Sequence, residues 1–323
     1  MSHNQLHTAS ECLVGAEREI QQLSSALELR QKQGLFLLDK TPDMSSNMAL
    51  QKAKRLLGVR KAGHTGSLDP LASGLLPICI GRATRLSSFL LNHDKRYIVE
   101  IRLGVTTETG DAEGAVVNEQ PVPELPTTLL NQTLASFVGE IEQVPPMYSA
   151  LKYKGKRLYE LARQGINVER KARLIKIYQI TLLGYDDHHL RLDVSCSKGT
   201  YIRTLAEDIG NQLGCGGHVA SLRRTEVGGL NLESAWTLEQ LQAIDSRLSR
   251  MQCVLDADEM LSDWPSVQLT QELAFYINRG QAVWMPKLPA SGWLRIYSKD
   301  NQFIGIGEIA ADGKLAPRRL FTG

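Results

Sequence analysis

The segment 63–74, GHTGSLDPLASG, holds the residues best suited to chemistry. Its single carboxylate, Asp69, lies among three glycines and directly before Pro70. Because proline disfavours helical geometry at the residue before it, Asp69 is expected on a rigid, non-helical loop. A carboxylate held in this way can act as a nucleophile or a general base. Two simpler interpretations remain open: an ordinary Asp-Pro turn, or a G-x-x-G loop that only clamps a nucleic-acid backbone.

Other catalytic patterns are missing from the sequence or stand in the wrong context. There is no G-x-x-x-x-G-K-[ST], H-E-x-x-H or G-x-S-x-G motif. Gly305, Gly307 and Ala310 match G-x-G-x-x-A, but they stand in a β-rich tail where no dinucleotide fold can follow. The five cysteines are scattered, so neither a disulfide framework nor a cysteine-rich zinc site is expected. The sequence therefore predicts no metal site and no nucleotide or serine-hydrolase chemistry.

The composition is that of an ordinary globular protein. Of 323 residues, 42% are hydrophobic and 22% are charged, with a net charge of +2. A charge this small does not point to nucleic acid, so any such partner must be argued from local basic clusters. No apolar run approaches the ~18 residues of a membrane span, and the first residues do not resemble a secretory signal. We expect a cytoplasmic protein with no membrane partner.

Strand and helix patterns mix without a regular βαβ rhythm. Residues 34–40 indicate a buried strand, and residues 97–103 and 190–196 alternate apolar and polar side chains as strands with one buried face do. The stretch SSNMALQKAKRLLG at 45–58 indicates a helix, with Ser46 as its candidate N-cap and Gly58 as the residue that ends it. This pattern favours an α+β fold with a mixed, largely antiparallel sheet.

The chain divides into three parts. Residues 1–34 are rich in Gln, Ser and Glu, and both an amphipathic helix and a mobile extension remain open for them. Residues 35–250 have the character of one compact catalytic domain. Residues 258–323 contain short strand patterns separated by turns, which indicates a small β-rich domain.

Four further stretches, taken together with the segment around Asp69, change the interpretation of that residue. Together the motifs resemble the tRNA pseudouridine synthase B family, in its stand-alone bacterial form, over about residues 35–323. The first motif resembles the catalytic motif of that family, with Ser67 where alanine is commoner, and the last resembles its RNA-gripping insertion. The matching stretches are GHTGSLDPLASGLLPICIG at 63–81, DKRYIVEIRLG at 94–104, SKGTYIRTLAEDIG at 197–210, GGHVASLRRTEVG at 216–228 and VPPMYSALKYKGKRLYELARQG at 144–165.

The resemblance implies an isomerase that converts uridine 55 in the T-arm of tRNA to pseudouridine, without a cofactor or a metal. Asp69 matches the essential aspartate of the family, and Arg203 matches an arginine that pairs with it. Four further positions match residues that bind the flipped nucleotide: Tyr97 as a stacking platform, Tyr201 and Leu222 around the uracil, and His64 as an RNA contact.

The resemblance also implies how the RNA is held. An insertion at about 144–176 interleaves basic and aromatic residues, as nucleic-acid grips do, and residues 258–323 resemble a PUA-like RNA-binding domain. The expected partner is the T-arm stem-loop of tRNA, bound by a monomer without an obligate protein partner. One departure concerns the usual L-D-K-P-x-G-x-S-S, which here has Thr41 for proline and Asp43 for glycine, so a differently shaped loop near Lys40 is expected.

Two other functions fit parts of the same pattern. An RNA-binding or tRNA-folding module would use the same basic and aromatic residues, but it has no need for Asp69 and Arg203 to meet. A separation beyond ~4–6 Å would favour that module. A guide-RNA-dependent pseudouridine synthase would share the catalytic motifs, whereas the long basic insertion favours the stand-alone form.

Overall fold

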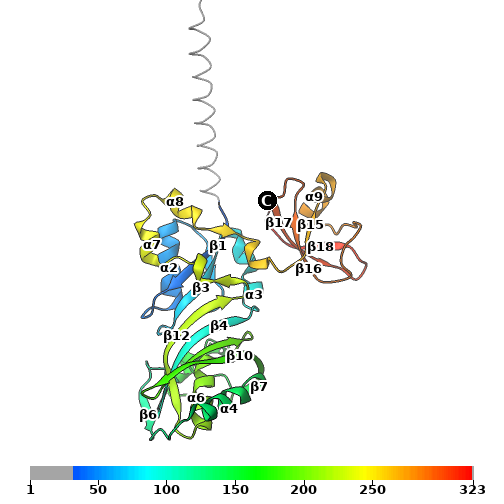
Figure 1. Ribbon diagram of the computed structural model, residues 1–323. Coiled ribbons are helices and arrows are strands. Elements are labelled where there is room, and N and C mark those ends of the chain that lie inside the picture. Colours follow the sequence, from blue (N-terminus) through cyan, green and yellow to red (C-terminus); the bar gives the residue numbers. More distant parts are fainter. Residues whose placement is uncertain (1–31, 322–323) are drawn as a thin grey trace, which may run out of the picture.

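The computed structural model describes residues 32–321, which fold into a large α+β body and a smaller β domain beside it (Figure 1). The expected α+β class is therefore confirmed. Residues 1–31, on which the expectation of a helical or mobile extension falls, lie outside the described part of the chain. Within residues 32–321, no helix is both long and apolar enough to cross a membrane.

Ten strands form the sheet of the large body. They are β1 (Gly34–Lys40), β2 (Ala62–His64), β3 (Ser73–Ile80), β4 (Lys95–Leu103), β7 (Gly139–Gln143), β10 (Arg173–Asp186), β11 (His189–Cys196), β12 (Gly217–Val227), β13 (Leu230–Asn231) and β14 (Leu255–Asp256). Their order is β14-β1-β3-β12-β4-β11-β10-β7, with β2 beside β3 and β13 beside β12. Only β3 and β12 run parallel, so the sheet is mixed and largely antiparallel, as expected.

Helices and two hairpins surround this sheet. Figure 1 shows α2, α7 and α8 at one end and α4 and α6 at the other. The helices are α2 (Ser46–Leu57), α3 (Ser87–Leu90), α4 (Thr127–Ser136), α5 (Leu158–Ala162), α6 (Ile202–Gln212), α7 (Leu238–Ala243) and α8 (Arg247–Gln252), with a 3-10 turn, η1 (Gly81–Leu86). The hairpins are β5 (Val105–Thr107) with β6 (Val116–Glu119), and β8 (Lys152–Tyr153) with β9 (Lys156–Arg157).

The first strand is buried on both faces, as its continuous apolar pattern predicts. Phe36 and Leu38 pack in the main core, whereas Leu35 and Leu37 pack in a second cluster on the opposite face of the sheet. The alternation follows from the two-residue period of a strand. This strand therefore anchors the sheet between two cores, and it ends at Lys40 beside the loop that carries Asp69.

The helix after this strand begins one residue earlier than the sequence suggests. The N-cap is Ser45, whose hydroxyl accepts a hydrogen bond from the Met48 amide at 3.2 Å. Ser46 was the expected cap, and that prediction is wrong because its hydroxyl is buried and bonded elsewhere. Gly58 ends the helix as expected, with a left-handed φ of 63° and its amide bonded to the carbonyl of Arg55.

The smaller domain is built on a four-stranded sheet in the order β15-β16-β17-β18, and the expected β-rich character of this part is confirmed. Its contact with the large body includes a cluster of Phe89, Trp264 and Trp293, whose ring centroids lie 5.0–5.6 Å apart. The domain contains β15 (Ser266–Gln268), α9 (Gln271–Asn278), β16 (Trp293–Tyr297), β17 (Phe303–Ile309) and β18 (Leu315–Leu320).

Candidate active site

Asp69 lies on the loop that joins the antiparallel strands β2 and β3. The backbone turns with left-handed φ values at Gly66 (89°) and Gly74 (99°). At Gly74 a Cβ atom would lie 2.2 Å from the carbonyl oxygen of Arg224, so only glycine fits where the loop meets β12. The expected rigid, non-helical loop is therefore present.

Two side chains fix the loop on either side of Asp69. Before it, the Ser46 hydroxyl accepts from the Leu68 amide at 2.7 Å and lies 2.8 Å from the Leu68 carbonyl, to which it donates. After it, the Lys40 ammonium donates to the Pro70 carbonyl at 3.2 Å. These contacts hold the backbone of Asp69 between β1 and α2.

The departure from the family motif near Lys40 lies on a turn that contains one left-handed residue. Asp43 stands where the family has glycine, and it adopts the left-handed φ of 61° that glycine favours. Lys40 is fully buried, and it also donates to the carbonyls of Thr41 and Met44. Burial lowers the pKa of Lys40 to about 8. The expectation that this loop differs in shape from that of the family stays a prediction.

Arg203 contacts Asp69 directly. Its Nε atom lies 3.0 Å from Asp69 Oδ2. This distance is shorter than the ~4–6 Å beyond which a module that only binds RNA would be favoured. Its Nη1 and Nη2 groups donate to the carbonyls of Thr109 and Tyr148, each at 2.8 Å. The Arg203 side chain is 7% exposed and the Asp69 side chain 42%. A guanidinium held by two backbone carbonyls thus pairs with a carboxylate that remains open to a ligand.

Burial and neighbouring charges act on Asp69 in opposite directions. Protein encloses the carboxylate on all but its open face, and this desolvation raises the pKa of Asp69 above its ordinary value. The charge of Arg203 offsets part of the rise, whereas the buried carboxylate of Asp111 adds to it. Asp111 Oδ2 lies 3.7 Å from Arg203 Nη1, so one guanidinium serves two carboxylates.

Tyr97 lies on β4 and contacts a buried cation. It is 8% exposed, and its hydroxyl is hydrogen-bonded to Arg224. Arg224 is 1% exposed, and its guanidinium donates to the carbonyls of Leu75 and Gly66. Burial raises the pKa of Tyr97. Arg224 therefore ties the aromatic ring of β4 to the loop that carries Asp69.

Tyr201 and Leu222 approach the same site from two further elements. Gln143 clamps the backbone of Tyr201, accepting from its amide at 2.8 Å and donating to its carbonyl at 3.0 Å. Leu222 on β12 is paired with Val99 on β4 and is buried in the core cluster that includes Tyr97. Burial raises the pKa of Tyr201, and the nearby Asp69 charge contributes to the rise.

His64 lies on β2 and makes no hydrogen bond or ion pair with Asp69 in the described residues. Its Nδ1 atom is buried and has no hydrogen-bond partner within that same part of the chain. Burial, with a smaller effect of the Arg224 charge, lowers the pKa of His64 below its ordinary value, which favours the neutral ring. Of the other five expected site residues, only Arg203 forms an ion pair with Asp69 in the described part of the chain.

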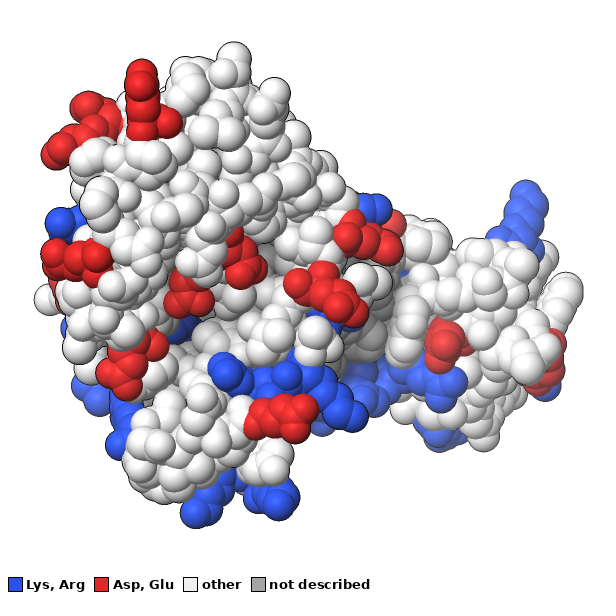
Figure 2. Space-filling view, turned by 90° about the horizontal axis from the view of Figure 1, so that it is seen from below, with Lys and Arg blue, Asp and Glu red and all other residues white. Residues whose placement is uncertain are grey.

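The basic insertion is exposed and joined to the ion pair. Its hairpin of β8 and β9 turns at Lys154 and Gly155, and its basic side chains pack over its tyrosines. The Arg163 guanidinium lies 5.5 Å from the centre of the Tyr159 ring. Because the Tyr148 carbonyl accepts from Arg203, this insertion reaches the catalytic pair through one hydrogen bond. In Figure 2, Lys and Arg side chains gather in the middle of the face and continue toward the smaller domain.

Sequence reasoning missed three residues that shape this site: Ser46, Asp111 and Arg224. A signal existed for Arg224, because alternation along β12 places it on the inward face together with Leu222. No sequence signal points to Asp111. Among residues 32–321, no group of three or more His, Cys, Asp or Glu side chains is arranged to hold a metal ion.

Three consecutive parts of the chain match known families. Residues 54–202 match "TruB family pseudouridylate synthase (N terminal domain)", residues 203–262 match "tRNA pseudouridylate synthase B C-terminal domain", and residues 265–321 match "Pseudouridine synthase II TruB, C-terminal". The matched stretches include every expected site residue.

Curated relatives are similar over most of their length. A protein named tRNA pseudouridine synthase B from Nitrosococcus oceani is 52% identical over 289 residues, which cover 89% of this chain and 94% of the relative. A protein of the same name from Pseudomonas aeruginosa is 51% identical over 290 residues, with 89% and 95% covered.

Solved structures share the fold at lower identity. A chain in the crystal structure of a Cbf5–Nop10–Gar1 complex aligns with a TM-score of 0.70 and 24% identity, covering 90% of this chain and 85% of its own. A chain in an H/ACA ribonucleoprotein bound to substrate RNA aligns with a TM-score of 0.69 and 22% identity, covering 92% and 87%. At these identities the likeness concerns the fold alone.

Proposed function

The chain belongs to the TruB family of pseudouridylate synthases, and we propose that it converts uridine 55 in the T-arm of tRNA to pseudouridine. The reaction needs an ionised carboxylate in a fixed orientation, with one face open to a nucleotide. The 3.0 Å contact between Arg203 and a half-exposed Asp69 is the observation that carries this proposal. A protein that only binds RNA has no use for such a pair.

The reaction is an isomerisation, so its atoms balance without a co-reactant. The bond from C1′ to N1 breaks, the uracil turns, and a new bond joins C1′ to C5. N1 gains a proton, and C5 loses one. Asp69 can serve by attacking the nucleotide or by stabilising positive charge at C1′, and both roles require its ionised form. Arg203 supports that form by its charge and contacts the carboxylate through Nε, while Nη1 and Nη2 hold the guanidinium in place on two backbone carbonyls.

The target base has to leave its stack to reach Asp69. Tyr97 offers a ring against which the flipped base can stack, with Arg224 holding its hydroxyl. Tyr201 and Leu222 bound the space around the uracil, and neutral His64 contacts RNA outside it. Leu68 and Ala72, close to Asp69 on either side, pack in the same core cluster as Tyr97 and Leu222.

The insertion at 144–176 and the domain at 258–323 are the proposed RNA contacts. The first presents exposed cations beside tyrosine rings, and the second resembles a PUA-like fold. Residues 35–250 form the proposed catalytic part. We propose that the chain acts on the T-arm stem-loop in the cytoplasm as a monomer, without a guide RNA. Turnover of bare tRNA by the purified chain tests the stand-alone form, and activity that appears only with an added guide RNA would reject it.

The decisive experiment measures tritium released from tRNA labelled at C5 of uridine. Wild type should release the label from position 55, and Asp69→Asn should release essentially none. Asp193→Asn is the matched control, because Asp193 also pairs with an arginine, Arg96, at 2.8 Å on the same sheet. That control should keep its activity. Normal turnover by Asp69→Asn would reject the proposed chemistry, and unchanged activity in a position-55 substitution of the tRNA would reject the proposed target.

A further inference from the structure

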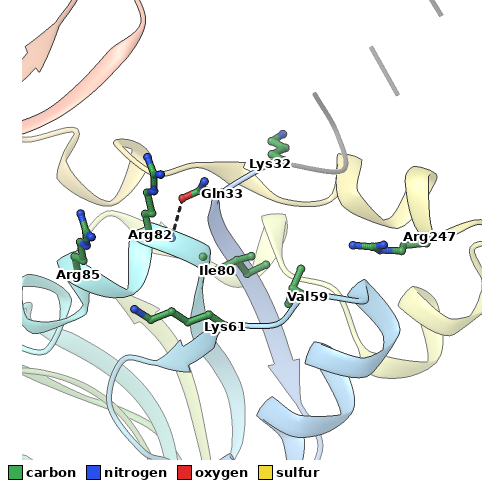
Figure 3. Close-up of a pocket in the computed structure, with 9 residues that line it drawn as sticks. Lys32, Gln33, Val59, Lys61, Ile80, Arg82, Arg85 and Arg247 are labelled. Carbon is green, nitrogen blue, oxygen red and sulfur yellow. Dashed lines mark hydrogen bonds between the residues drawn. The ribbon is translucent and has the colours of Figure 1, made fainter. Parts of the chain in front are cut away.

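A basic pocket lies at the far end of β3 from Asp69. It has a volume of about 300 Å³ and is lined by nine residues (Figure 3). Five of the nine are cations contributed by separate segments of the chain, and none is acidic. The cations are Lys32, Lys61, Arg82, Arg85 and Arg247. We call this set the basic pocket.

Within residues 32–321, no side chain neutralises the positive charge of the basic pocket. None of the five cations forms an ion pair with a residue of the described chain, and the hydrogen bonds that their side chains make go to backbone carbonyls. The ammonium groups of Lys32 and Lys61 make no hydrogen bond within residues 32–321. Five like charges around one hollow repel each other, so an anion placed between them would be stabilised.

The smaller domain fixes two of these cations. Arg82 donates through Nη1 to the carbonyl of Phe321, and Arg85 donates through Nη1 to the carbonyl of Leu320 at 2.9 Å. The floor of the pocket is equally ordered, because Gln33 accepts from the Arg82 amide at 2.8 Å. Each guanidinium keeps further N–H groups for a ligand. The pocket is thus arranged before any ligand arrives, which lowers the entropic cost of binding.

The chemistry of the lining selects a phosphate rather than a base. No lining residue is aromatic, so the pocket offers no surface on which a nucleobase could stack. Guanidinium forks match phosphate oxygens, and lysine supplies point charges. We propose that the basic pocket binds a phosphate group of the tRNA backbone, at a contact remote from the target base. This proposal rests on the proposed function, since tRNA is the polyanion the chain would handle.

The position of the pocket makes it a second anchoring point. Within β3, Gly74 lies beside the Asp69 loop and Ile80 lies in the pocket lining. At ~3.3 Å per residue, the two residues are ~20 Å apart along the strand. A contact so far from Asp69 would add affinity for a long RNA without taking part in the reaction.

The test compares two RNAs on the full chain. Equilibrium binding of an unmodified tRNA transcript and of an isolated T-arm stem-loop is measured for wild type, Lys61→Gln and the double variant Lys32→Gln/Lys61→Gln. The ratio of tRNA affinity to stem-loop affinity should fall several-fold in the double variant. The slope of log K against log salt for tRNA should flatten by about one unit for the lost phosphate contact. Lys52→Gln, at an exposed lysine on α2, is the charge-matched control for Lys61→Gln and should leave the ratio unchanged.

Three results would overturn the proposal. An unchanged ratio in the double variant would show that tRNA does not use the pocket. An equal fall of this ratio in Lys52→Gln would show that the effect comes from the overall charge of the protein and not from the pocket. Inorganic phosphate that raises the melting temperature of wild type but not of the double variant, while tRNA affinity is unaffected, would assign the pocket to free phosphate. Label release from the stem-loop by wild type tests the proposed function separately, so failure of one proposal is distinguishable from failure of the other.

Discussion

The Asp69 loop and the insertion at 144–176 are held by opposite means. The loop is fixed by buried side chains that bond to its backbone: Ser46 to Leu68, Lys40 to Pro70 and Arg224 to Gly66. The insertion carries exposed cations packed over its own tyrosines. Buried, satisfied bonds fix geometry, whereas exposed charges contribute long-range attraction that salt screens.

The two ways of holding a segment suit two different functions, catalysis and RNA binding. A loop fixed in this way serves a chemical step, because a misplacement of ~1 Å at a reacting group can slow a reaction ~10²-fold. An exposed basic surface serves affinity and association rate instead. We therefore expect changes around the loop to lower kcat and changes in the insertion to raise KM. The Tyr148 carbonyl, which accepts from Arg203, is the one described hydrogen bond that joins the insertion to the catalytic ion pair.

Apart from the loss of Asp69 itself, the largest effect is expected from Arg203→Gln. The variant removes the charge beside Asp69 and leaves the buried Asp111 without its cationic neighbour. We expect kcat to fall ~10²–10³-fold, the usual consequence of losing one preorganised electrostatic contact. Single-turnover label release measures it. Arg96→Gln, which breaks an exposed pair with Asp193, is the control and should change kcat less than about twofold. Equal kcat values for the two variants would mean that the pair of Arg203 and Asp69 has no special role in catalysis.

The two adjacent serines separate positioning from stability. Ser46→Ala removes both bonds to Leu68, next to Asp69, and leaves a buried backbone amide unsatisfied. We expect kcat to fall about tenfold and the free energy of unfolding to fall by ~1–3 kcal/mol. Ser45→Ala removes only the helix cap, so it should lower the unfolding free energy by ~0.5–2 kcal/mol and leave kcat unchanged. Denaturant unfolding and single-turnover kinetics give both quantities. A parallel loss of kcat in the two variants would contradict the positioning role.

The fold class and the ion pair could be predicted from sequence because their signals are local or carried by motifs. Alternation over 97–103 and 190–196 predicts strands, and both are present as parts of β4 and β11. The contact between Asp69 and Arg203 followed from the motifs that resemble the family. The site roles assigned to Tyr97, Tyr201, Leu222 and His64 remain predictions that the proposed experiments test.

Other features depend on packing between distant segments. Two neighbouring serines are equally good N-caps by type, and only the position of Leu68 decides that Ser46 turns inward. Asp111 comes to Arg203 through a long-range fold that no local pattern encodes. The basic pocket draws cations from four places along the chain, none of them a cluster in sequence. These features form only when distant segments of the chain pack together, so no local sequence pattern predicts them.

The pH dependence of catalysis should show how desolvation and the charge of Arg203 together determine the pKa of Asp69. Because desolvation raises the pKa of Asp69, activity should fall by about tenfold per pH unit below a midpoint that lies above the value of an ordinary aspartate. Arg203 opposes this rise, so the midpoint should move to higher pH in Arg203→Gln. A pH–rate profile from single-turnover kinetics on the stem-loop measures both. An unshifted midpoint in Arg203→Gln would show that the guanidinium does not support the ionised form.

The same pKa shift has a consequence for stability. A carboxyl with a raised native pKa binds its proton more tightly in the native state, so its contribution to stability is lost as pH rises through the interval between the two pKa values. Asp69→Asn should therefore unfold at a higher temperature than wild type at neutral pH, and the difference should vanish below the ordinary pKa of aspartate. Thermal unfolding across pH, with Asp193→Asn as the control, checks this. A less stable Asp69→Asn at neutral pH would mean that the pair with Arg203 outweighs desolvation.

The smallest effect is expected in the insertion. Lys152→Gln/Lys154→Gln removes two exposed cations of the β8–β9 hairpin, of which Lys154 packs over the Tyr153 ring. KM for the stem-loop should rise several-fold, and the slope of log K against log salt should flatten by about one to two units, while kcat stays within about twofold. Steady-state kinetics at two salt concentrations measure these changes, with Lys52→Gln as the control. Because Tyr148 bonds to Arg203 through its carbonyl, and the substituted lysines lie beyond it on the hairpin, loss of charge should leave the catalytic pair in place. A fall in kcat larger than the rise in KM would show that the hairpin positions Arg203 as well as gripping RNA, and the separation between geometry and affinity would no longer hold.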